Sequence, residues 1–268
     1  MASPYTYYNT GGSLGARLAT RKPVLSSGQR WYLSSVIGSD SYNGRERHKP
    51  LATLAAAHTA AAAGDTIQIL AGHAELLPGA QTFNKARLHI YGEGAGSSLP
   101  RFTAAAAIAM FDVTAAGVVF ESLYFPASTA APTARVRFAA VAGQVVSCAF
   151  ECGASDTNAA LQFVTGAGQC RVKDTTFTST ATVVTSQPDT GLEVVNAMSD
   201  LELENLIFDG GNCGWSDFAL KGTAAITGVF ALDISLLRDS DYFFATGTSG
   251  RFHVKDGATG SARSQWDA

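Results

Sequence analysis

Apolar and polar residues alternate with a period of two along much of the chain after residue 64, which is the pattern of half-buried β-strands. Within this region four segments repeat one spacing, in which an apolar residue is followed three positions later by a second interior-type residue and five positions later by phenylalanine. The four sets are Phe120, Leu123 and Phe125; Val145, Cys148 and Phe150; Val172, Thr175 and Phe177; and Leu203, Leu206 and Phe208. Repetition on this scale indicates stacked structural units.

The spacing of these repeats predicts a solenoid. Their first positions, at residues 120, 145, 172 and 203, are 25, 27 and 31 residues apart, and one coil of a parallel β-helix takes roughly 20–30 residues. The segments 86–94 and 229–237 look like an earlier and a later copy. We therefore predict an all-β fold, a single-stranded right-handed parallel β-helix over residues 64–240, with the repeated phenylalanines stacked inside it.

The segment before the repeats has a different pattern. Residues 30–63 hold a short apolar strand, a turn cluster and an alanine-rich stretch, which predicts a helix over residues 52–63 with Thr53 as its N-cap and Gly64 as its stop. We expect this helix to cap the stack, because the open end of a solenoid must be covered. Residues 1–29 are predicted to be an extended arm, and residues 241–268 a C-terminal cap and tail.

Charge is sparse and unevenly distributed. Charged residues make up 15% of the chain, and the net charge is −3. Residues 1–50 hold seven Lys and Arg against two acidic residues, a balance of +5, so the rest of the chain carries −8. A basic segment on an acidic body favours contact with an acidic surface or between copies of the chain, although a solvated arm has the same composition.

Several classes of protein are disfavoured. The start MASPYTYYNTGG lacks the basic-then-apolar pattern of a signal peptide, and no run reaches the roughly 18 apolar residues of a membrane span. Cys148, Cys152, Cys170 and Cys213 lack zinc-ligand spacing, and nucleotide-binding and metalloprotease motifs are absent from the sequence. We expect buried thiols at Cys148 and Cys170, no cofactor or metal, no membrane contact, and synthesis in a host cytoplasm without a signal peptide.

The segment GSDSYNGRERHKPLATLAAAHTAAAAGDTIQILAGHAE, residues 38–75, resembles the pectate-lyase-like right-handed parallel β-helix superfamily. The resemblance rests on the order of its Gly-Ser-Asp, Ala-Thr-Leu, Gly-Asp-Thr-Ile and Ala-Gly-His-Ala-Glu blocks, and it extends over residues 30–235. The AGHAE variant, with the GEG that follows it, is most similar to members encoded in tailed bacteriophages. The resemblance implies the fold but not one activity, because the fold carries lyases, hydrolases and inert virion parts.

His73 and Glu75 lie two positions apart beside Gly72 and are the first candidates for chemistry. In the family pattern this turn leaves the first strand of the solenoid. No third polar group in the sequence is placed to orient the imidazole. We therefore interpret the pair as a structural corner rather than a catalytic dyad.

Polysaccharide-cleaving members of the family use carboxylates on the outer surface, either to bind Ca²⁺ or as an acid pair, which must lie about 5–9.5 Å apart to cleave a glycosidic bond. Aligning the four repeats gives outward rows of Glu121, Val146, Lys173 and Glu204; Ser122, Ser147, Asp174 and Asn205; and Pro126, Glu151, Thr178 and Asp209. None of these rows has two carboxylates in adjacent coils, and Lys173 above Glu204 predicts an exposed ion pair. The remaining candidates are the cluster Asp200, Glu202 and Glu204, which alternates along one strand, and the pair Asp239 and Asp241.

The arm carries the candidate partner interface. It is poor in large aliphatic side chains and cannot fold alone, but it holds tyrosines, which are enriched at protein interfaces. The candidate contact residues are Tyr5, Tyr7, Tyr8, Arg17, Arg21, Lys22 and Arg30. We expect them to bind the major capsid protein or another virion protein, or a neighbouring copy in a homo-oligomer or lattice, rather than nucleic acid.

Two classes of function remain. The first is a non-enzymatic structural protein of a tailed-phage virion, most specifically a capsid decoration or cement protein attached through its arm. The second is a tailspike-like protein that binds polysaccharide or degrades it as a lyase or glycoside hydrolase. We expect Tyr124, Trp215 and Trp266 to be exposed, where they would suit a carbohydrate-binding surface.

Overall fold

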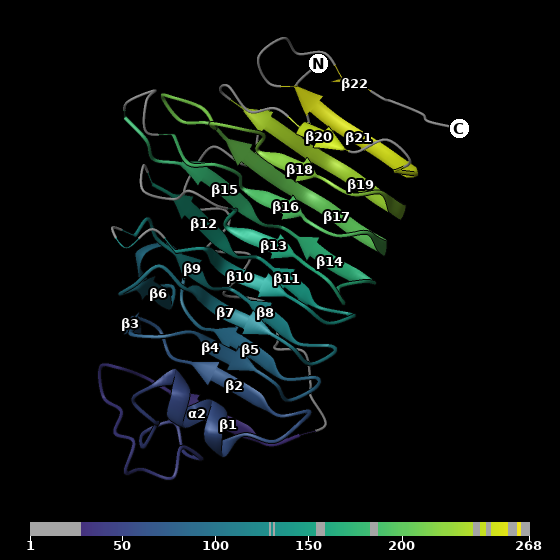
Figure 1. Cartoon of the computed structure of the whole chain (residues 1–268). Helices are drawn as coiled ribbons and strands as arrows, with labels where there is room; N and C mark the ends of the chain where they lie inside the picture. Colours follow the sequence, from purple (N-terminus) through teal and green to yellow (C-terminus); the bar gives the residue numbers. More distant parts are fainter. Residues whose placement is uncertain are drawn as a thin grey trace, which may run out of the picture.

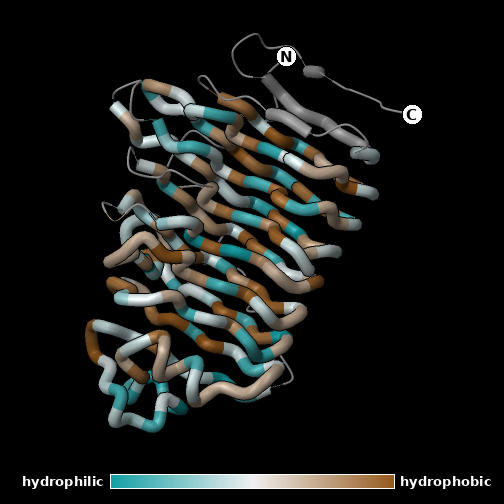
Figure 2. Tube along the Cα trace, viewed as in Figure 1, coloured by the Kyte–Doolittle hydropathy of each residue, from teal (hydrophilic) through white to brown (hydrophobic). Residues whose placement is uncertain are grey.

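The computed structural model describes residues 28–128, 130, 132–153, 159–182, 187–237, 242–244, 248–256 and 262–263. In these residues the chain winds into stacked coils, and the strands of successive coils pair in parallel (Figure 1). Apolar and polar positions alternate along the stacked strands, as Figure 2 shows. The predicted all-β parallel β-helix is therefore confirmed.

The strands form three walls. The first wall contains β1 (Arg30–Leu33), β2 (Thr66–Ile69), β5 (His89–Gly92), β8 (Val119–Glu121), β11 (Gln144–Val146), β14 (Cys170–Lys173), the first parts of β17 (Met198–Asp209) and β19 (Ile226–Leu237), and β21 (Gly250–Asp256). The second wall contains β3 (Ala74–Leu77), β6 (Arg101–Ala104), β9 (Tyr124–Phe125), β12 (Ala149–Cys152), β15 (Thr176–Ser179) and the second parts of β17 and β19. Because β17, β19 and β21 run along both, these two walls form one sheet, which reaches 15 strands with a terminal strand at residues 262–263.

The third wall is a separate seven-stranded sheet. Its strands are β4 (Gln81–Phe83), β7 (Ala109–Val113), β10 (Ala134–Phe138), β13 (Leu161–Phe163), β16 (Leu192–Val194), β18 (Leu220–Gly222) and β20 (Tyr242–Phe244). Parallel pairing begins at β1 and continues to β21, so it extends past the predicted limits of 64 and 240. At the far end β22 (Ala262–Arg263) pairs antiparallel with β21 and departs from the parallel pattern.

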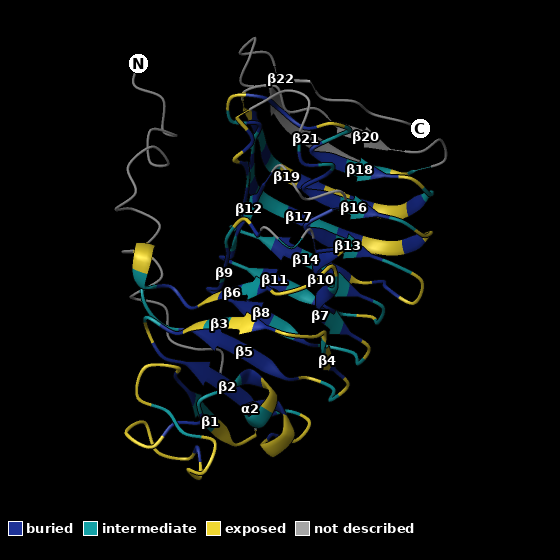
Figure 3. Cartoon of the chain, turned by 60° about the vertical axis from the view of Figure 1, so that its left-hand side comes forward, coloured by how far each residue is buried: buried dark blue, intermediate teal, exposed yellow. Residues whose placement is uncertain are grey.

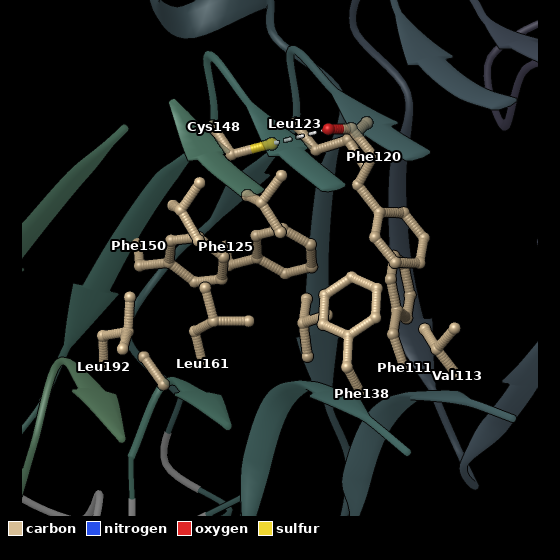
Figure 4. Packing of buried hydrophobic residues seen from close by; sticks show 14 of the residues in the cluster. Phe111, Val113, Phe120, Leu123, Phe125, Phe138, Cys148, Phe150, Leu161 and Leu192 are labelled. Carbon is tan, nitrogen blue, oxygen red and sulfur yellow. Dashed lines mark hydrogen bonds between the residues drawn. The ribbon is translucent and has the colours of Figure 1, made fainter. Parts of the chain in front are cut away.

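The interior is an apolar core with an aromatic ladder. Phe125, Phe150, Phe177 and Phe208 occupy one register position of the second wall. Neighbouring rings of this ladder are stacked, with centroids 4.8, 5.0 and 4.8 Å apart. Phe120 is also fully buried, as predicted, but it contacts a second aromatic group from the third wall that includes Phe111 and Phe138 (Figure 4).

Left-handed residues turn the chain between the first and second walls. Ser122, Ser147, Asp174, Asn205 and Asp233 have φ between 51° and 59°. Short polar side chains tolerate this conformation better than other non-glycine residues do. The sequence alignment had placed the first four in an outward row of a strand. They are instead stacked corner positions, and Asn205 Nδ2 donates a hydrogen bond to Asp174 Oδ1 at 2.7 Å.

The helix α2 (Leu54–Ala60) covers the N-terminal end of the stack (Figure 1). Thr53 is its N-cap, as predicted, and accepts a hydrogen bond from the amide of Ala56. The helix is shorter than the predicted 52–63, because Ala61 is extended and Lys85 Nζ hydrogen-bonds the carbonyl oxygens of His58, Thr59 and Ala61. A lysine that satisfies the last carbonyl groups replaces the glycine stop expected at residue 64.

The Gly-Ser-Asp block of the sequence has a structural role beside this helix. Asp40 accepts hydrogen bonds from the amides of Ala52 and Thr53 at 2.8 and 2.9 Å and from the Thr53 hydroxyl at 2.8 Å. Burial opposes ionisation of Asp40, but these hydrogen bonds outweigh it and hold the pKa of the carboxyl below its ordinary value. The motif that carries the family resemblance therefore fixes the chain in front of α2.

Candidate functional site

The acidic cluster predicted on β17 is bound by basic residues of the neighbouring coil. Lys173 Nζ lies 2.6 Å from Glu204 Oε1, and Arg171 Nη2 lies 2.9 Å from Glu204 Oε2 and 3.2 Å from Glu202 Oε1. The register of β14 against β17 sets Arg171 beside Glu202 and Lys173 beside Glu204. The predicted Lys173–Glu204 ion pair is present, but it is half-buried rather than exposed. Its hydrogen bond is the main reason that the pKa of Glu204 lies below its ordinary value.

Asp200 does not continue this row. Its φ of 55° is left-handed, so the chain turns there and the regular alternation assumed from the sequence is broken. The three carboxylates therefore do not share one straight outward face. Asp239 and Asp241, the second predicted acidic pair, lie outside the described residues.

The outer face of the third wall carries a similar column of paired charges. Arg137 Nε lies 2.9 Å from Asp112 Oδ1, one coil away. Glu193 accepts a hydrogen bond from Gln162 at 3.1 Å and lies 3.8 Å from Lys221 Nζ. One register column of the third wall holds these five residues, in the order Asp112, Arg137, Gln162, Glu193 and Lys221. These carboxylates thus join neighbouring coils.

His73 and Glu75 form the structural corner that the sequence predicted. His73 Nε2 lies 3.1 Å from Glu75 Oε2, and Glu75 accepts the amide of Leu54 at the start of α2 at 2.9 Å. The expectation that nothing orients the imidazole was wrong, because the backbone amide of Ser35 donates to His73 Nδ1 at 2.9 Å. That bond comes from the main chain, which a search for polar side chains does not detect. The fully buried His73 ties three segments together.

The structure contains a second His–carboxylate pair, which the sequence analysis did not predict. His89 Nε2 lies 3.0 Å from Glu121 Oε2, and both side chains are buried on the outward side of the first wall. They are 32 residues apart in sequence. Extending the repeat alignment back to the segment 86–94 would not have paired them, because the register of β5 against β8 sets His89 opposite Val119 and Tyr91 opposite Glu121, so the contact is diagonal.

The second wall carries one mixed group of aromatic and charged side chains. Tyr124 is half-buried and hydrogen-bonds Glu151, and Arg101 lies beside Tyr124 in the register of β6 and β9. Burial, and then the hydrogen bond to Glu151, raise the pKa of the Tyr124 phenol well above its ordinary value. Trp215, predicted to be exposed, is buried at 6% relative exposure, because it packs against the apolar core. Trp266 lies outside the described residues.

The predicted arm interface falls mostly outside the described residues, since Tyr5, Tyr7, Tyr8, Arg17, Arg21 and Lys22 all precede residue 28. Arg30 is exposed and begins β1, the first strand of the 15-stranded sheet. Exposed positions elsewhere are seen on the loops, on α2 and on β3 (Figure 3).

The part of the chain that the structure describes contains no group of three or more His, Cys, Asp or Glu arranged to hold a metal ion. All four cysteines are buried, and burial is the main cause that raises the pKa of Cys148 to about 12. None of the described helices has both the length and the apolar character needed to cross a membrane.

Comparison with known proteins gives distant structural similarities. No protein-family model matches the sequence, and no curated protein matches it. Pectate lyase Pel9A is 13% identical, with a TM-score of 0.47 over 91% of this chain and 79% of the lyase. The pectin methylesterase from Aspergillus niger is 11% identical, with a TM-score of 0.48 over 88% of both chains. A rhamnogalacturonan lyase is 14% identical, with a TM-score of 0.36 over 83% of this chain and 70% of the lyase. Similarity at this level assigns no activity to this chain.

Proposed function

We propose that this chain is a non-enzymatic structural protein of a tailed-phage virion, a capsid decoration protein attached through its N-terminal arm. The non-enzymatic part of the proposal rests on what the carboxylates of the outer surface bind. Glu204, Asp112 and Glu193 each bind a basic or amide side chain of the adjacent coil. Carboxylates committed to joining coils are not poised to bind Ca²⁺ or to act as an acid pair.

The attachment part of the proposal rests on the arm. Residues 1–27 contain three tyrosines within the first eight positions and three basic residues but no acidic residue. Tyrosine is enriched at protein interfaces because it buries a large, rigid surface at low entropic cost. The virion setting rests on the resemblance of residues 38–75 to phage-encoded members of the superfamily.

A polysaccharide-binding role is the second candidate, and Tyr124 favours it. A half-buried aromatic ring beside Glu151 and Arg101 combines an apolar face with polar groups, as sugar-binding surfaces do. This candidate predicts retention of the protein on a host polysaccharide column that Tyr124→Ala abolishes.

Sedimentation with phage particles that lack the wild-type protein tests the main proposal. The variant Tyr5→Ala/Tyr7→Ala/Tyr8→Ala should lose binding by about a thousandfold or more, because truncating one interface anchor at about 2 kcal/mol costs about thirtyfold and two such anchors already cost about a thousandfold. Tyr42→Ala is the matched control, since Tyr42 is an exposed tyrosine of the body at 43% relative exposure. The control should bind like the wild type.

Equal decoration by the triple variant and the wild type would contradict attachment through the arm. Failure of the wild-type protein to sediment with the particles would contradict the virion role itself.

A further inference from the structure

The outer side of the first wall exposes two large apolar side chains next to each other. Phe230 and Leu232 of β19 alternate with the buried Val229 and Ala231, so they point outward, and their relative exposures are 41 and 38%. Among the phenylalanines whose side chains the structure describes, Phe230 alone is exposed. Single exposed apolar residues need no explanation, but an apolar patch bordered by polar residues is typical of an interaction surface.

The patch is one row of a larger surface, which we call the four-strand face. It consists of the outward residues of β11, β14, β17 and β19, which follow one another along the first wall (Figure 1). These residues form two register columns, Gln144, Arg171, Glu202 and Phe230 in the first, and Val146, Lys173, Glu204 and Leu232 in the second. From β11 to β19 the four rows are therefore mixed polar and apolar, basic, acidic and apolar.

The order of the basic and acidic rows is self-complementary. We consider two copies packed face to face about a two-fold axis that runs parallel to the strands, between β14 and β17. This rotation reverses the order of the strands and keeps each position along a strand. The basic row of each copy then faces the acidic row of the other, with Arg171 opposite Glu202 of the partner copy and Lys173 opposite Glu204 of the partner copy. An isologous contact of this kind closes at two copies.

The same rotation also covers the apolar row. It places β19 of each copy on β11 of the other, because each strand lies one rung beyond the charged rows. Leu232 then faces the half-buried Val146 of the partner copy, and Phe230 faces the aliphatic stem of Gln144 of the partner copy. Apolar side chains that a single copy leaves in water are removed from it in the pair.

The charge pattern excludes the other simple two-fold arrangement. An axis along the direction in which the coils stack would place β14 on β14 and β17 on β17. Basic side chains would then face basic ones and acidic side chains acidic ones, and such like-charge contacts are unfavourable. The face therefore favours one relative orientation of two copies.

The ion pairs within one chain leave these charges accessible to a second copy. Arg171 lies 3.2 Å from Glu202, yet the two side chains remain 37 and 41% exposed. Each carboxylate has several acceptor positions and each guanidinium has five N–H donors, so one intramolecular contact does not exhaust them. Opposite charges from the partner copy would extend the two pairs of each chain into a network.

We propose that the four-strand face binds the same face of a second copy of this chain and forms a two-fold dimer. The contact involves eight outward residues of each copy, fewer than the roughly 20–30 residues per side of a stable complex. The dimer should therefore dissociate on dilution. The inference does not depend on the virion role, because it concerns two copies of this chain alone.

Sedimentation velocity of the full-length protein over a dilution series tests the inference. The wild type should change from dimer to monomer on dilution. Leu232→Ser should weaken the dimer about tenfold or more, because the two-fold axis removes the leucine from both sides of the contact. Leu76→Ser is the matched control, since Leu76 is 62% exposed on β3 in the second wall, and it should dimerise like the wild type.

Charge reversal tests whether the two charged rows face each other. Glu202→Lys/Glu204→Lys makes both rows basic, and Arg171→Glu/Lys173→Glu makes both rows acidic. Each variant alone should dimerise about tenfold or more weakly than the wild type, because its face repels its own copy. An equimolar mixture of the two variants should form a heterodimer. Mixing does not repair a folding defect, so recovery in the mixture reports on the contact.

Three results would overturn the inference. The first is a wild type that stays monomeric at every concentration at which it is soluble. The second is equal dimerisation of Leu232→Ser and the wild type, which would place the contact between copies elsewhere on the chain. The third is a mixture of the folded charge-reversal variants that forms no heterodimer.

Discussion

At the residue scale, backbone conformation and main-chain hydrogen bonds determine what several polar side chains do, and residue type alone does not predict this. Ser122, Ser147, Asp174 and Asn205 are left-handed corners, so their side chains serve the bend and not an outward strand face. His73 is oriented by a main-chain amide. Both features depend on φ and on main-chain geometry, which sequence alignment does not report, and both shift apparently reactive residues into structural roles.

His58 gives a prediction about pH at this scale. It is buried on α2 against Phe83, and burial, then the charge of Lys85, lower its pKa from 6.5. Between that lowered pKa and 6.5 the unfolded chain binds a proton that the native state does not. The free energy of unfolding should therefore be fully present above pH 6.5 and fall as the pH drops below it.

Urea unfolding across this pH range checks the His58 prediction. His58→Gln should flatten the decline in the free energy of unfolding, whereas His48→Gln, at an exposed position, should leave its slope unchanged. An identical decline in wild type and His58→Gln would show that another group carries it.

At the scale of the element, the aromatic ladder binds successive strands of the second wall to one another. Each ring from Phe125 to Phe208 stacks on the next at 4.8 to 5.0 Å, and the parallel register repeats that contact in every coil. Outside the core, Lys173–Glu204 joins two coils of the ladder through its charges, and Arg137–Asp112 joins the first of its coils to the coil before it. These pairs are only partly exposed, and ion pairs in contact with water contribute about 1 kcal/mol or less each, against about 3–5 kcal/mol for a core aromatic ring.

Phe177→Ala should lower the free energy of unfolding by about 3–5 kcal/mol, the usual cost of removing a core aromatic. Phe177 is fully buried between Phe150 and Phe208. Thr178→Ala, the neighbouring outward position, should change it by less than about 0.5 kcal/mol. Denaturant titration measures both values, and a loss in Phe177→Ala no larger than the control's would remove the ladder from the account.

At the scale of the whole molecule, the repeat spacing predicted the coil, its register and the ladder, because stacked coils must place equivalent residues together. Phe111 and Phe138 of the third wall were not found, since their strands are separated from the repeats by loops of differing length. The His89–Glu121 pair was missed for a related reason, because it joins two coils diagonally. Trp215 was misjudged, since aromatic residues flanked by polar neighbours give no sign of folding inward.

The central claim at this scale is that the outer carboxylates hold the coils together and do no chemistry. Incubation of the full-length protein with pectate and with host capsule polysaccharide, with and without Ca²⁺, followed by an assay for reducing ends, tests it most directly. The account predicts no release above the buffer control in either condition. Reproducible release of reducing ends that Glu202→Gln or Asp200→Asn abolishes would contradict it and identify the acidic cluster of β17 as an active site.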